Sequence, residues 1–382
     1  MQSPKPPMTN KQRLLTAASF QEADRVPIEL RIPAQARALP ECKRIVEFID
    51  QEADNFIGVS GSVSWGFFGL STKSYQEIVE DRPGEYRIVR RVHSTENGDF
   101  TALTKHTYPD LDNPDFLWIK HYIANLDDFD RLINAPRTVR SFSPETYREK
   151  VARVGERGVP IVGLRHPLGT LVRNADMLEV YAWIAAEPQR MHRFLEVTNN
   201  QIIETIKAMG AAGMSPWFIT HAHEMLIPPW LGRKQFDEFV FPYDKQVNDA
   251  IHAVGGRIRA HCHGNVMQFL ERMADMGIDA TEPLEPPPYG DVDLAEAKRL
   301  VGGRMLLSGN IPSQAFVEMT PEEVTACVRQ AIDVAAAGGG FTLRPTGGNA
   351  GIDPYLDKAT LKKVVANVEA YIEAGLQYGS YH

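Results

Sequence analysis

The chain has 382 residues, of which 43% are hydrophobic, so it is long and apolar enough to bury a sizeable core. A formal net charge of −8 with only short basic runs argues against a nucleic-acid partner. No run of about 18 apolar residues occurs, so we expect no membrane span. The polar start, "MQSPKPPMTNKQRLL", lacks the apolar region of a secretory signal, which predicts a cytoplasmic protein.

The first 157 residues contain one strand-like run and one hairpin-like run. Residues 24–30, "DRVPIEL", are predicted to form a strand. Residues 84–106 alternate apolar and polar side chains and contain Asn97–Gly98, a pair typical of a tight turn, so they predict an antiparallel ribbon. We expect residues 31–157 to form a long insertion packed on the rest of a single domain that spans residues 1–382.

Short apolar runs alternate with amphipathic helical patterns from residue 158 onward. The predicted strands cover residues 158–164, 215–224, 257–264, 278–285, 304–312 and 341–348. The helical pattern over 233–256 is broken or begins near Pro242. The pattern after residue 319 has Thr320 as its N-cap and Pro321 in its first turn.

This alternation implies a parallel sheet, which either stays open and doubly wound or closes into a barrel. No GxGxxG sequence follows a predicted strand, so the usual dinucleotide-binding fingerprint is absent. We therefore favour an α/β fold of the (β/α)8, TIM-barrel type, with residues 24–30 available as the eighth strand.

Polar side chains gather at the ends of the predicted strands, where barrels of this type have their active sites. These strand-end residues are Arg165, His166, His221, His223, Glu224, His261, His263, Glu282, Glu285, Asn310, Arg344 and Thr346. Five of the chain's 11 histidines are among them, which makes this edge of the sheet the predicted functional site.

A metal site is predicted from the stretch "RAHCHGNV". His261 and His263 lie two residues apart on a strand, so their side chains share a face and Cys262 points the other way. Two imidazoles and a carboxylate from a neighbouring strand suit Zn²⁺, and Glu224 is the best candidate for that carboxylate. The three cysteines of the chain are too few and too odd in number to indicate a disulfide framework.

Several strand-end residues allow a second interpretation. His221 and His223 can instead donate hydrogen bonds to a bound carboxylate or phenolate. Glu282 is either a general base or a cap of the loop that follows it. Arg344 either anchors an acidic group of a substrate or forms a structural ion pair with a glutamate.

The run from 249 to 312 resembles the uroporphyrinogen decarboxylase superfamily. The motifs that carry the resemblance are "RAHCHG", "GIDATEPLE", "DVDLAEAK" and "SGNIP", preceded by the helix "QFDEFVFPYDKQV". The likeness extends over about residues 158–375 and implies a (β/α)8 barrel. It also implies one of two activities: decarboxylation of a porphyrinogen without a cofactor, or zinc-dependent methyl transfer that involves a corrinoid or a thiol.

The motifs that separate these two activities are both altered here. True decarboxylases have an arginine-rich N-terminal motif, and "RIPAQARALPEC" keeps Arg31 and Arg37 at a different spacing. The methyltransferases have an H-x-C motif and a late cysteine as metal ligands. His261 matches the histidine, but His263 stands in place of the first cysteine and Gly347 and Gly348 occupy the region of the second. Metal ligands would then be nitrogen and oxygen atoms, with Glu224 or, as the less favoured choice, Glu282 as the carboxylate. Such a ligand set favours demethylation of an ether over thiol methylation.

The leading hypothesis is a zinc-dependent methyltransferase that demethylates a methoxylated small molecule, an O-demethylase, and passes the methyl group to a corrinoid carried by a partner protein. His261, His263 and Glu224 would bind the metal, and His223 or Glu282 would handle a proton. The substrate-binding residues would be Arg165, His166, His221, Asn310 and Arg344.

Two other hypotheses remain open. In a metal-free decarboxylase, Arg31, Arg37, Arg165 and Arg344 would hold the substrate carboxylates. A module that binds a small molecule or a corrinoid without catalysis is the third possibility, although the many ionisable strand-end residues argue against it.

Overall fold

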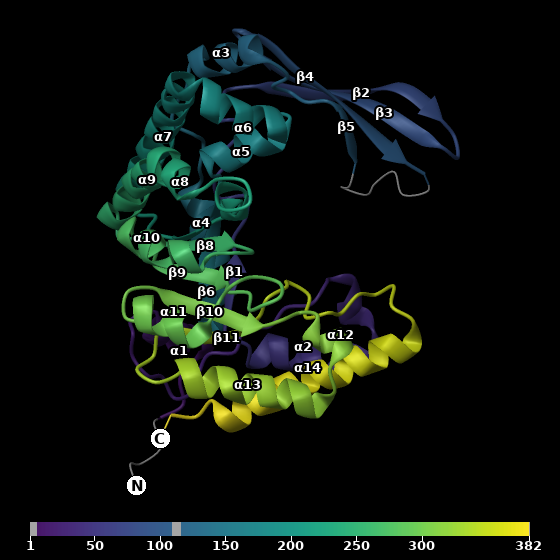
Figure 1. Ribbon diagram of the computed structural model, residues 1–382, viewed down its shortest axis with the longest axis vertical. Helices are drawn as coiled ribbons and strands as arrows, with labels where there is room; N and C mark the ends of the chain where they lie inside the picture. The colour runs from purple at the N-terminus through teal and green to yellow at the C-terminus, as the bar shows by residue number, and fades with distance from the viewer. Residues whose placement is uncertain (1–5, 109–115, 382) are drawn as a thin grey trace.

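The structure is a computed structural model that describes residues 6–108 and 116–381. Residues 1–5 of the polar start and 109–115 of the predicted insertion lie outside this part. Its described strands form a parallel sheet of seven strands, in the order β1-β6-β7-β8-β9-β10-β11, and an antiparallel sheet of four, in the order β2-β3-β4-β5 (Figure 1). The parallel strands are β1 (Asn55–Gly58), β6 (Gly158–Leu164), β7 (Trp217–Thr220), β8 (Arg257–Cys262), β9 (Ala280–Pro283), β10 (Leu306–Ile311) and β11 (Phe341–Pro345).

The segment predicted as the eighth strand lies between the two edge strands of the parallel sheet. Ile28 forms a parallel bridge with Leu343 of β11, and the Glu29 amide donates to the Leu343 carbonyl over 2.9 Å. On the other side, the Asp54 amide donates to the Ile28 carbonyl over 2.8 Å. The segment therefore connects β11 to β1, as expected of a sheet that curls in the TIM-barrel manner.

This segment is not a regular strand, so the described sheet has seven regular strands where a (β/α)8 barrel has eight, and one of the seven, β1, was not predicted. Pro27 has no amide hydrogen to donate to a ladder. Side chains also replace part of the backbone pairing with β1: the Ile28 amide donates to Asp54 Oδ2 over 2.8 Å, and the Leu30 amide donates to Asn55 Oδ1 over 3.1 Å. The α/β class and the parallel sheet are confirmed.

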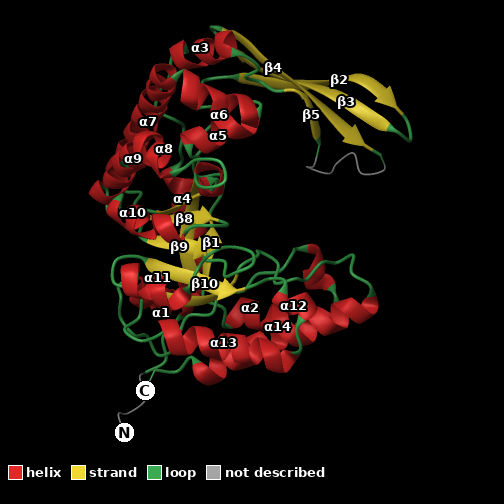
Figure 2. Ribbon diagram, viewed as in Figure 1, coloured by secondary structure: helices red, strands yellow, loops and turns green. Residues whose placement is uncertain are grey.

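Helices surround the parallel strands in the order that the sequence predicted (Figure 2). The helices that follow β6, β7 and β8 are α5 (Pro167–Asn174), α6 (Met177–Ala186), α7 (Pro188–Ala211), α8 (Arg233–Phe239), α9 (Phe241–Ala253) and α10 (Leu270–Asp275). Those that follow β9, β10 and β11 are α11 (Leu294–Val301), α12 (Ala315–Glu318), α13 (Pro321–Ala335) and α14 (Lys358–Tyr378). None of the described helices is both long and apolar enough to cross a lipid bilayer.

Local helix signals in the sequence are confirmed. Thr320 caps α13, and a capping box joins it to Glu323, with Pro321 in the first turn. Pro242 lies in the first turn of α9, directly after α8 ends. Near the start of the chain, α1 (Asn10–Ala18) buries Leu14 and Ala17 in a small apolar cluster with residues of the parallel strands, including Phe56 and Ile161.

The predicted ribbon is part of the antiparallel sheet, which extends away from the parallel sheet (Figure 1). Its strands are β2 (Lys73–Arg82), β3 (Tyr86–Thr95), β4 (Gly98–Thr107) and β5 (Leu117–Lys120). Thr95 pairs with Gly98, so the turn consists of Glu96 and Asn97, one residue earlier than predicted. Gly98 has a φ of +102°, in the region that favours glycine.

Residues 31–157, the predicted insertion, contain other elements besides the antiparallel sheet. β1 lies within this range and belongs to the parallel sheet, and the helices of this range are α2 (Lys43–Gln51), α3 (Leu126–Asn134) and α4 (Pro144–Val154). The part that lies apart from the parallel sheet therefore begins after β1. The assignment of residues 1–382 to a single domain stays a prediction.

Candidate active site

Charged side chains from several strands meet inside the curled sheet. Arg259 of β8 contacts both carboxylate oxygens of Glu29 over 3.0 Å, although β8 is the central strand of the order and Glu29 lies beside β11 at its edge. Thr342 Oγ1 donates to Glu29 Oε1 over 2.7 Å. The curl of the sheet brings these side chains together, because β9, β10 and β11 separate β8 from Glu29 in the strand order.

Arg344 and Glu282 belong to the same buried network. Arg344 forms an ion pair with Glu282 and lies 3.7 Å from Glu29, and Arg259 lies 3.6 Å from Glu282. Burial lowers the pKa of Arg344 to about 9. Of the two roles that the sequence allowed for Arg344, the structure shows the structural ion pair. Glu282 thus faces two guanidinium groups, and its role as a general base or as a loop cap stays a prediction.

Three imidazoles lie beyond this network, at the C-terminal ends of β7 and β8. The ring centroid of His261 lies 5.0 Å from that of His221 and 4.6 Å from that of His263. Nδ1 of His261 donates to Glu282 over 3.2 Å, and Nδ1 of His263 donates to Glu285 over 2.9 Å. The Nε2 atoms of His261 and His263 form no hydrogen bond with the described residues, so both can serve as ligands.

The protonation states of these imidazoles differ for physical reasons. Burial, with a further contribution from the neighbouring His263, lowers the pKa of His261 to about 3. Burial and the neighbouring His261 lower the pKa of His221 to about 4. The hydrogen bond and negative charge of Glu285 raise the pKa of His263. At neutral pH His221 and His261 are therefore neutral, which is the form that binds metal ions.

Glu224 follows β7 in a short 3₁₀ turn and contributes to the same environment. Its Oε1 lies 3.7 Å from Arg173, and its Oε2 is buried without a hydrogen-bond partner among the described residues. The negative charge of Glu224 acts on His221, His261 and His263, opposing the lowering of the first two pKa values. A buried carboxylate oxygen without a partner is costly, and a bound cation would remove that cost.

The predicted metal ligands His261, His263 and Glu224 are thus neighbours, but they are not drawn together as tightly as ligands of a bound ion. Within residues 6–108 and 116–381, the group of three whose ligand atoms all lie within 4.8 Å of one another is His166, His223 and Asp244. Side-chain rotation would be needed before the predicted set could close around an ion.

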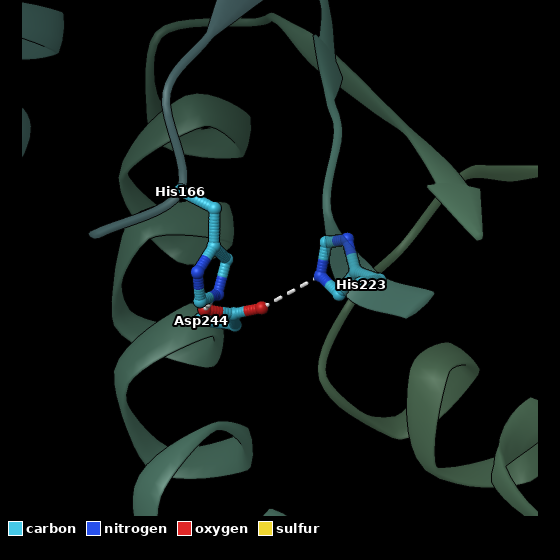
Figure 3. A group of neighbouring side chains, drawn as sticks. All are labelled: His166, His223 and Asp244. Atoms are coloured by element: carbon cyan, nitrogen blue, oxygen red, sulfur yellow. Dashed lines mark hydrogen bonds and ion pairs between the residues drawn. The ribbon is translucent and has the colours of Figure 1, made fainter. Parts of the chain in front are cut away.

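The group of His166, Asp244 and His223, called here the His–Asp–His group, is fully buried (Figure 3). Nε2 of His166 donates to Asp244 Oδ1 over 2.7 Å, and Nε2 of His223 donates to Asp244 Oδ2 over 2.9 Å. Both imidazoles, aided by these hydrogen bonds, hold the pKa of Asp244 far below its usual range. Asp244 belongs to α9, so the group ties this helix to the ends of β6 and β7.

Its ligand atoms lie close enough to hold a metal ion, but the hydrogen bonds of His166 oppose this. Nδ1 of His166 accepts a hydrogen bond from the Gly169 amide over 3.2 Å, as the N-cap of α5. The proton of a neutral His166 is therefore on Nε2, the atom that would have to bind the ion. A metal here would require either loss of the helix cap or an imidazolate.

The chain geometry explains why neighbouring histidines belong to different groups. Ala222, between His221 and His223, has a φ of +83°, and this left-handed turn sends the two side chains to different places. His221 joins His261, whereas His223 is buried against Asp244. Sequence reasoning missed Asp244 because it lies on a helix. The one feature of the sequence that could have indicated Asp244 is its position in "FPYDK", within the helix that resembles the uroporphyrinogen decarboxylase superfamily.

The remaining predicted residues are dispersed. Arg165 is exposed after β6, and Asn310 lines a separate, mainly apolar cavity of about 370 Å³ beside α11 and α13. Thr346 Oγ1 accepts a hydrogen bond from the Ser313 amide. Of the arginines suggested for a decarboxylase, Arg31 is bound to the Phe56 carbonyl, and Arg37 pairs with Asp50 at the surface.

The family model for uroporphyrinogen decarboxylase (URO-D) matches residues 119–371. Uroporphyrinogen decarboxylase of Ralstonia pickettii is 27% identical to this chain over 208 residues, which cover 50% of this chain and 53% of that protein. Uroporphyrinogen decarboxylase of Dechloromonas aromatica is 26% identical over 198 residues, which cover 48% of this chain and 52% of that protein. The chain thus spans about half the length of these curated relatives. A solved methyltransferase from Methanosarcina mazei has a similar fold, with a TM-score of 0.55, 18% identity and coverage of 96% of this chain and 99% of its own. The chain belongs to the uroporphyrinogen decarboxylase (URO-D) family.

Proposed function

We propose that this protein is a zinc-dependent methyltransferase that takes a methyl group from a methoxylated small molecule. The methyl acceptor is a corrinoid carried by a partner protein. The solved protein of similar fold is described as a methyltransferase, which supports this choice within the family. The metal ligands are His261, His263 and Glu224, and His221 is a further nitrogen donor beside them.

The observation that carries the proposal is the way two carboxylates hold the histidines. Glu282 binds Nδ1 of His261 and Glu285 binds Nδ1 of His263, which leaves both Nε2 atoms free. Carboxylate–histidine pairs of this kind orient metal-ligating imidazoles and fix their tautomer. The buried Oε2 of Glu224 has no partner among the described residues and is the matching oxygen donor. The donor atoms are therefore of the types that zinc binds, and rotation of the side chains would bring them around the ion.

A zinc ion held by nitrogen and oxygen ligands supplies Lewis acidity, which polarises an ether oxygen. The protein's own residues do the rest. Arg259 and Arg344 pair with Glu282, and this carboxylate orients His261. His223 is a positioning residue in the proposal, because it is buried and bound to Asp244 and thereby fixes the turn that presents Glu224.

Metal analysis of purified protein tests the proposal and separates the two candidate metal sites. After reconstitution we expect about one equivalent of zinc, lost in His261→Ala. Asp244→Asn should retain the zinc with a lower affinity, because it disturbs the turn that presents Glu224 but leaves the ligands in place. The opposite pattern would move the metal to the His–Asp–His group. Less than about a tenth of an equivalent, unchanged by His261→Ala, would rule out the metal.

A second candidate is a metal-free decarboxylase, favoured by the names of the curated relatives. Its cationic residues would have to come from elsewhere than first expected, because Arg37 is paired at the surface and Arg344 is paired in the interior. Decarboxylation of a polycarboxylate substrate that survives chelation of metals would favour this function over methyl transfer.

A further inference from the structure

A second cavity lies beside the candidate active site, between the antiparallel sheet and the end of β6. Its volume is about 520 Å³, within the range of small-molecule sites. One side is built by β3, by the start of β5 and by the loop that precedes β2. The other side is built by Arg165 after β6 and by Asn174 at the end of α5. We call it the arginine cavity, because Arg91, Arg140 and Arg165 line it.

Charge in the arginine cavity is one-sided. No aspartate or glutamate is among the described residues that line it, and its three arginines form no ion pair with any described carboxylate. Nε of Arg91 is buried without a hydrogen-bond partner in this part of the chain. Arg140 donates to carbonyl oxygens, over 3.2 Å to Ser64 and 3.0 Å to Leu70, and burial lowers its pKa. Among the described residues, three cations gather around this cavity without counter-charges, which favours an anionic ligand.

Aromatic rings form the rest of the surface. The Phe67 ring lies 5.1 Å from that of Tyr122, and Trp118 contacts both Tyr122, at 5.9 Å, and Phe116, at 5.1 Å. The Arg91 guanidinium lies 5.1 Å from the Phe116 ring centroid. Such rings favour a flat, apolar partner, because a planar ring can pack against them both face to face and edge to face. The ligand should therefore combine a ring with a negative charge.

We propose that the arginine cavity binds an aromatic carboxylate, with the carboxylate held by Arg91, Arg140 and Arg165 and the ring packed against Trp118 and Phe116. Arg165 also lines the small hollow at the His–Asp–His group, so the carboxylate end of the ligand lies next to the end of β6. The binding site stands on its own. The further statement that the ligand is the substrate rests on the proposed function.

Titration calorimetry with 4-methoxybenzoate, on full-length protein kept metal-free by a chelator, tests the site. We expect saturable binding at one site. 4-Methoxybenzamide, which is flat but neutral, should bind about ten- to a hundred-fold more weakly, because it forms no charge-assisted hydrogen bonds with the arginines. 4-Methoxycyclohexanecarboxylate, which has the charge without the aromatic ring, should also bind more weakly.

Variants locate the binding. Arg91→Gln and Arg165→Gln should each weaken 4-methoxybenzoate binding about ten-fold or more. The matched control is Arg90→Gln, which removes a neighbouring charge from the same strand. Arg90 pairs with Glu77 and is not part of the cavity lining, so its loss should leave the affinity within about two-fold. Circular dichroism spectra confirm that each variant is folded.

Equal affinity for the acid and the amide, or equal effects of Arg90→Gln and Arg91→Gln, would overturn the proposal. Because the protein is metal-free and no methyl acceptor is present, these outcomes do not depend on the reaction. Failure of zinc binding would leave the cavity proposal intact, and failure of 4-methoxybenzoate binding would leave the metal proposal intact.

Discussion

At the scale of single residues, the paired glutamates decide what the histidines can do. Glu282 and Glu285 each accept a hydrogen bond from the Nδ1–H group of an imidazole, so the Nε2 atoms of His261 and His263 are the available ligand atoms. Cys262, between them, is buried, and burial raises the pKa of its thiol well above the usual value. A metal ion at residues 261–263 would therefore be bound by histidine nitrogen rather than by the sulfur of Cys262.

The carboxylate behind His263 should set the metal affinity. Glu285→Gln replaces the charged acceptor of Nδ1 with a neutral one and should weaken zinc binding about 10- to 100-fold. Competition with a coloured chelator measures this affinity. Glu296→Gln is the control, because Glu296 is a surface residue paired with Arg299 and should leave the affinity unchanged. Equal affinities of Glu285→Gln and the wild type would show that His263 is not a ligand.

The two histidines should also affect acid stability in opposite directions. His261 has a folded-state pKa of about 3 against an ordinary value of 6.5, so between these pH values the unfolded chain binds a proton that the folded chain does not. The contribution of His261 to the free energy of unfolding should therefore fall as the pH drops from 6.5 towards 3, by at most about 1.4 kcal/mol per pH unit. The pKa of His263 is raised, so its stabilisation is fully present below the unfolded-state pKa and is lost as the pH rises through the folded-state pKa.

Urea unfolding of chelator-treated protein at about pH 5 and about pH 7 measures both effects. His261→Asn should reduce the acid-side decline, and His263→Asn should steepen it. At about pH 8.5, above the titration range of both unfolded-state imidazoles, His261→Asn should show no pH-dependent difference from the wild type. Parallel stability curves of the wild type and His261→Asn across the acid range would contradict the prediction.

The sequence predicts part of this site because position on a strand is visible in a local pattern. His261 and His263 could be assigned to one face by their spacing alone. Asp244 could not be predicted as the partner of His166, because 78 residues separate them and no local pattern links a helix residue to two loops. The same is true of Arg91 and Arg140, which reach the arginine cavity from the antiparallel sheet and from a loop.

At the scale of elements, the His–Asp–His group connects α9 with the ends of two strands. Asp244 lies in the first turn of the helix, and its two carboxylate oxygens hold one histidine after β6 and one after β7. The turn after β7 also presents His221 and Glu224, so the orientation of α9 affects the candidate metal site.

Removing this charge should destabilise the fold. Asp244→Asn replaces one acceptor oxygen with an NH₂ group that faces an imidazole N–H, and should lower the free energy of unfolding by about 3 kcal/mol at neutral pH. Urea denaturation measures the change. Asp249→Asn is the matched control on the same helix: Asp249 is exposed and paired with Lys245, so its loss should have an effect under about 1 kcal/mol. Similar values for the two variants would show that the group does not stabilise the fold.

The alternation of strands and helices after residue 158 could be predicted because each parallel strand is a short apolar run that ends in polar residues. β1 could not, because four residues, Asn55–Gly58, show no period. The segment around Ile28 resembled a strand, but its pairing depends on the side chains of Asp54 and Asn55, which no backbone pattern reveals.

At the scale of the whole molecule, one buried ion network joins the central strand β8 to the β11 edge of the parallel sheet. Glu29 comes from the segment between β11 and β1, Arg259 from β8 and Arg344 from β11. Arg259 and Glu29 are almost completely excluded from solvent, so each depends on the other for compensation of its charge. The network lies beneath the histidines and reaches them through Glu282.

A double-mutant cycle should show that this network holds the sheet closed. Glu29→Gln leaves Arg259 and Arg344 without their shared carboxylate and should cost about 3–5 kcal/mol of unfolding free energy. Arg259→Gln should cost a similar amount, and the double variant clearly less than the sum, with a coupling of about 1–3 kcal/mol. The exposed pair Arg37 and Asp50 provides the control cycle, with a coupling under about 1 kcal/mol. Additive effects at Glu29 and Arg259 would mean that closure depends on backbone pairing around Ile28 instead.

Because Glu282 contacts the same guanidinium groups, the stability loss in Glu29→Gln should come with weaker zinc binding, whereas the control variants should change neither.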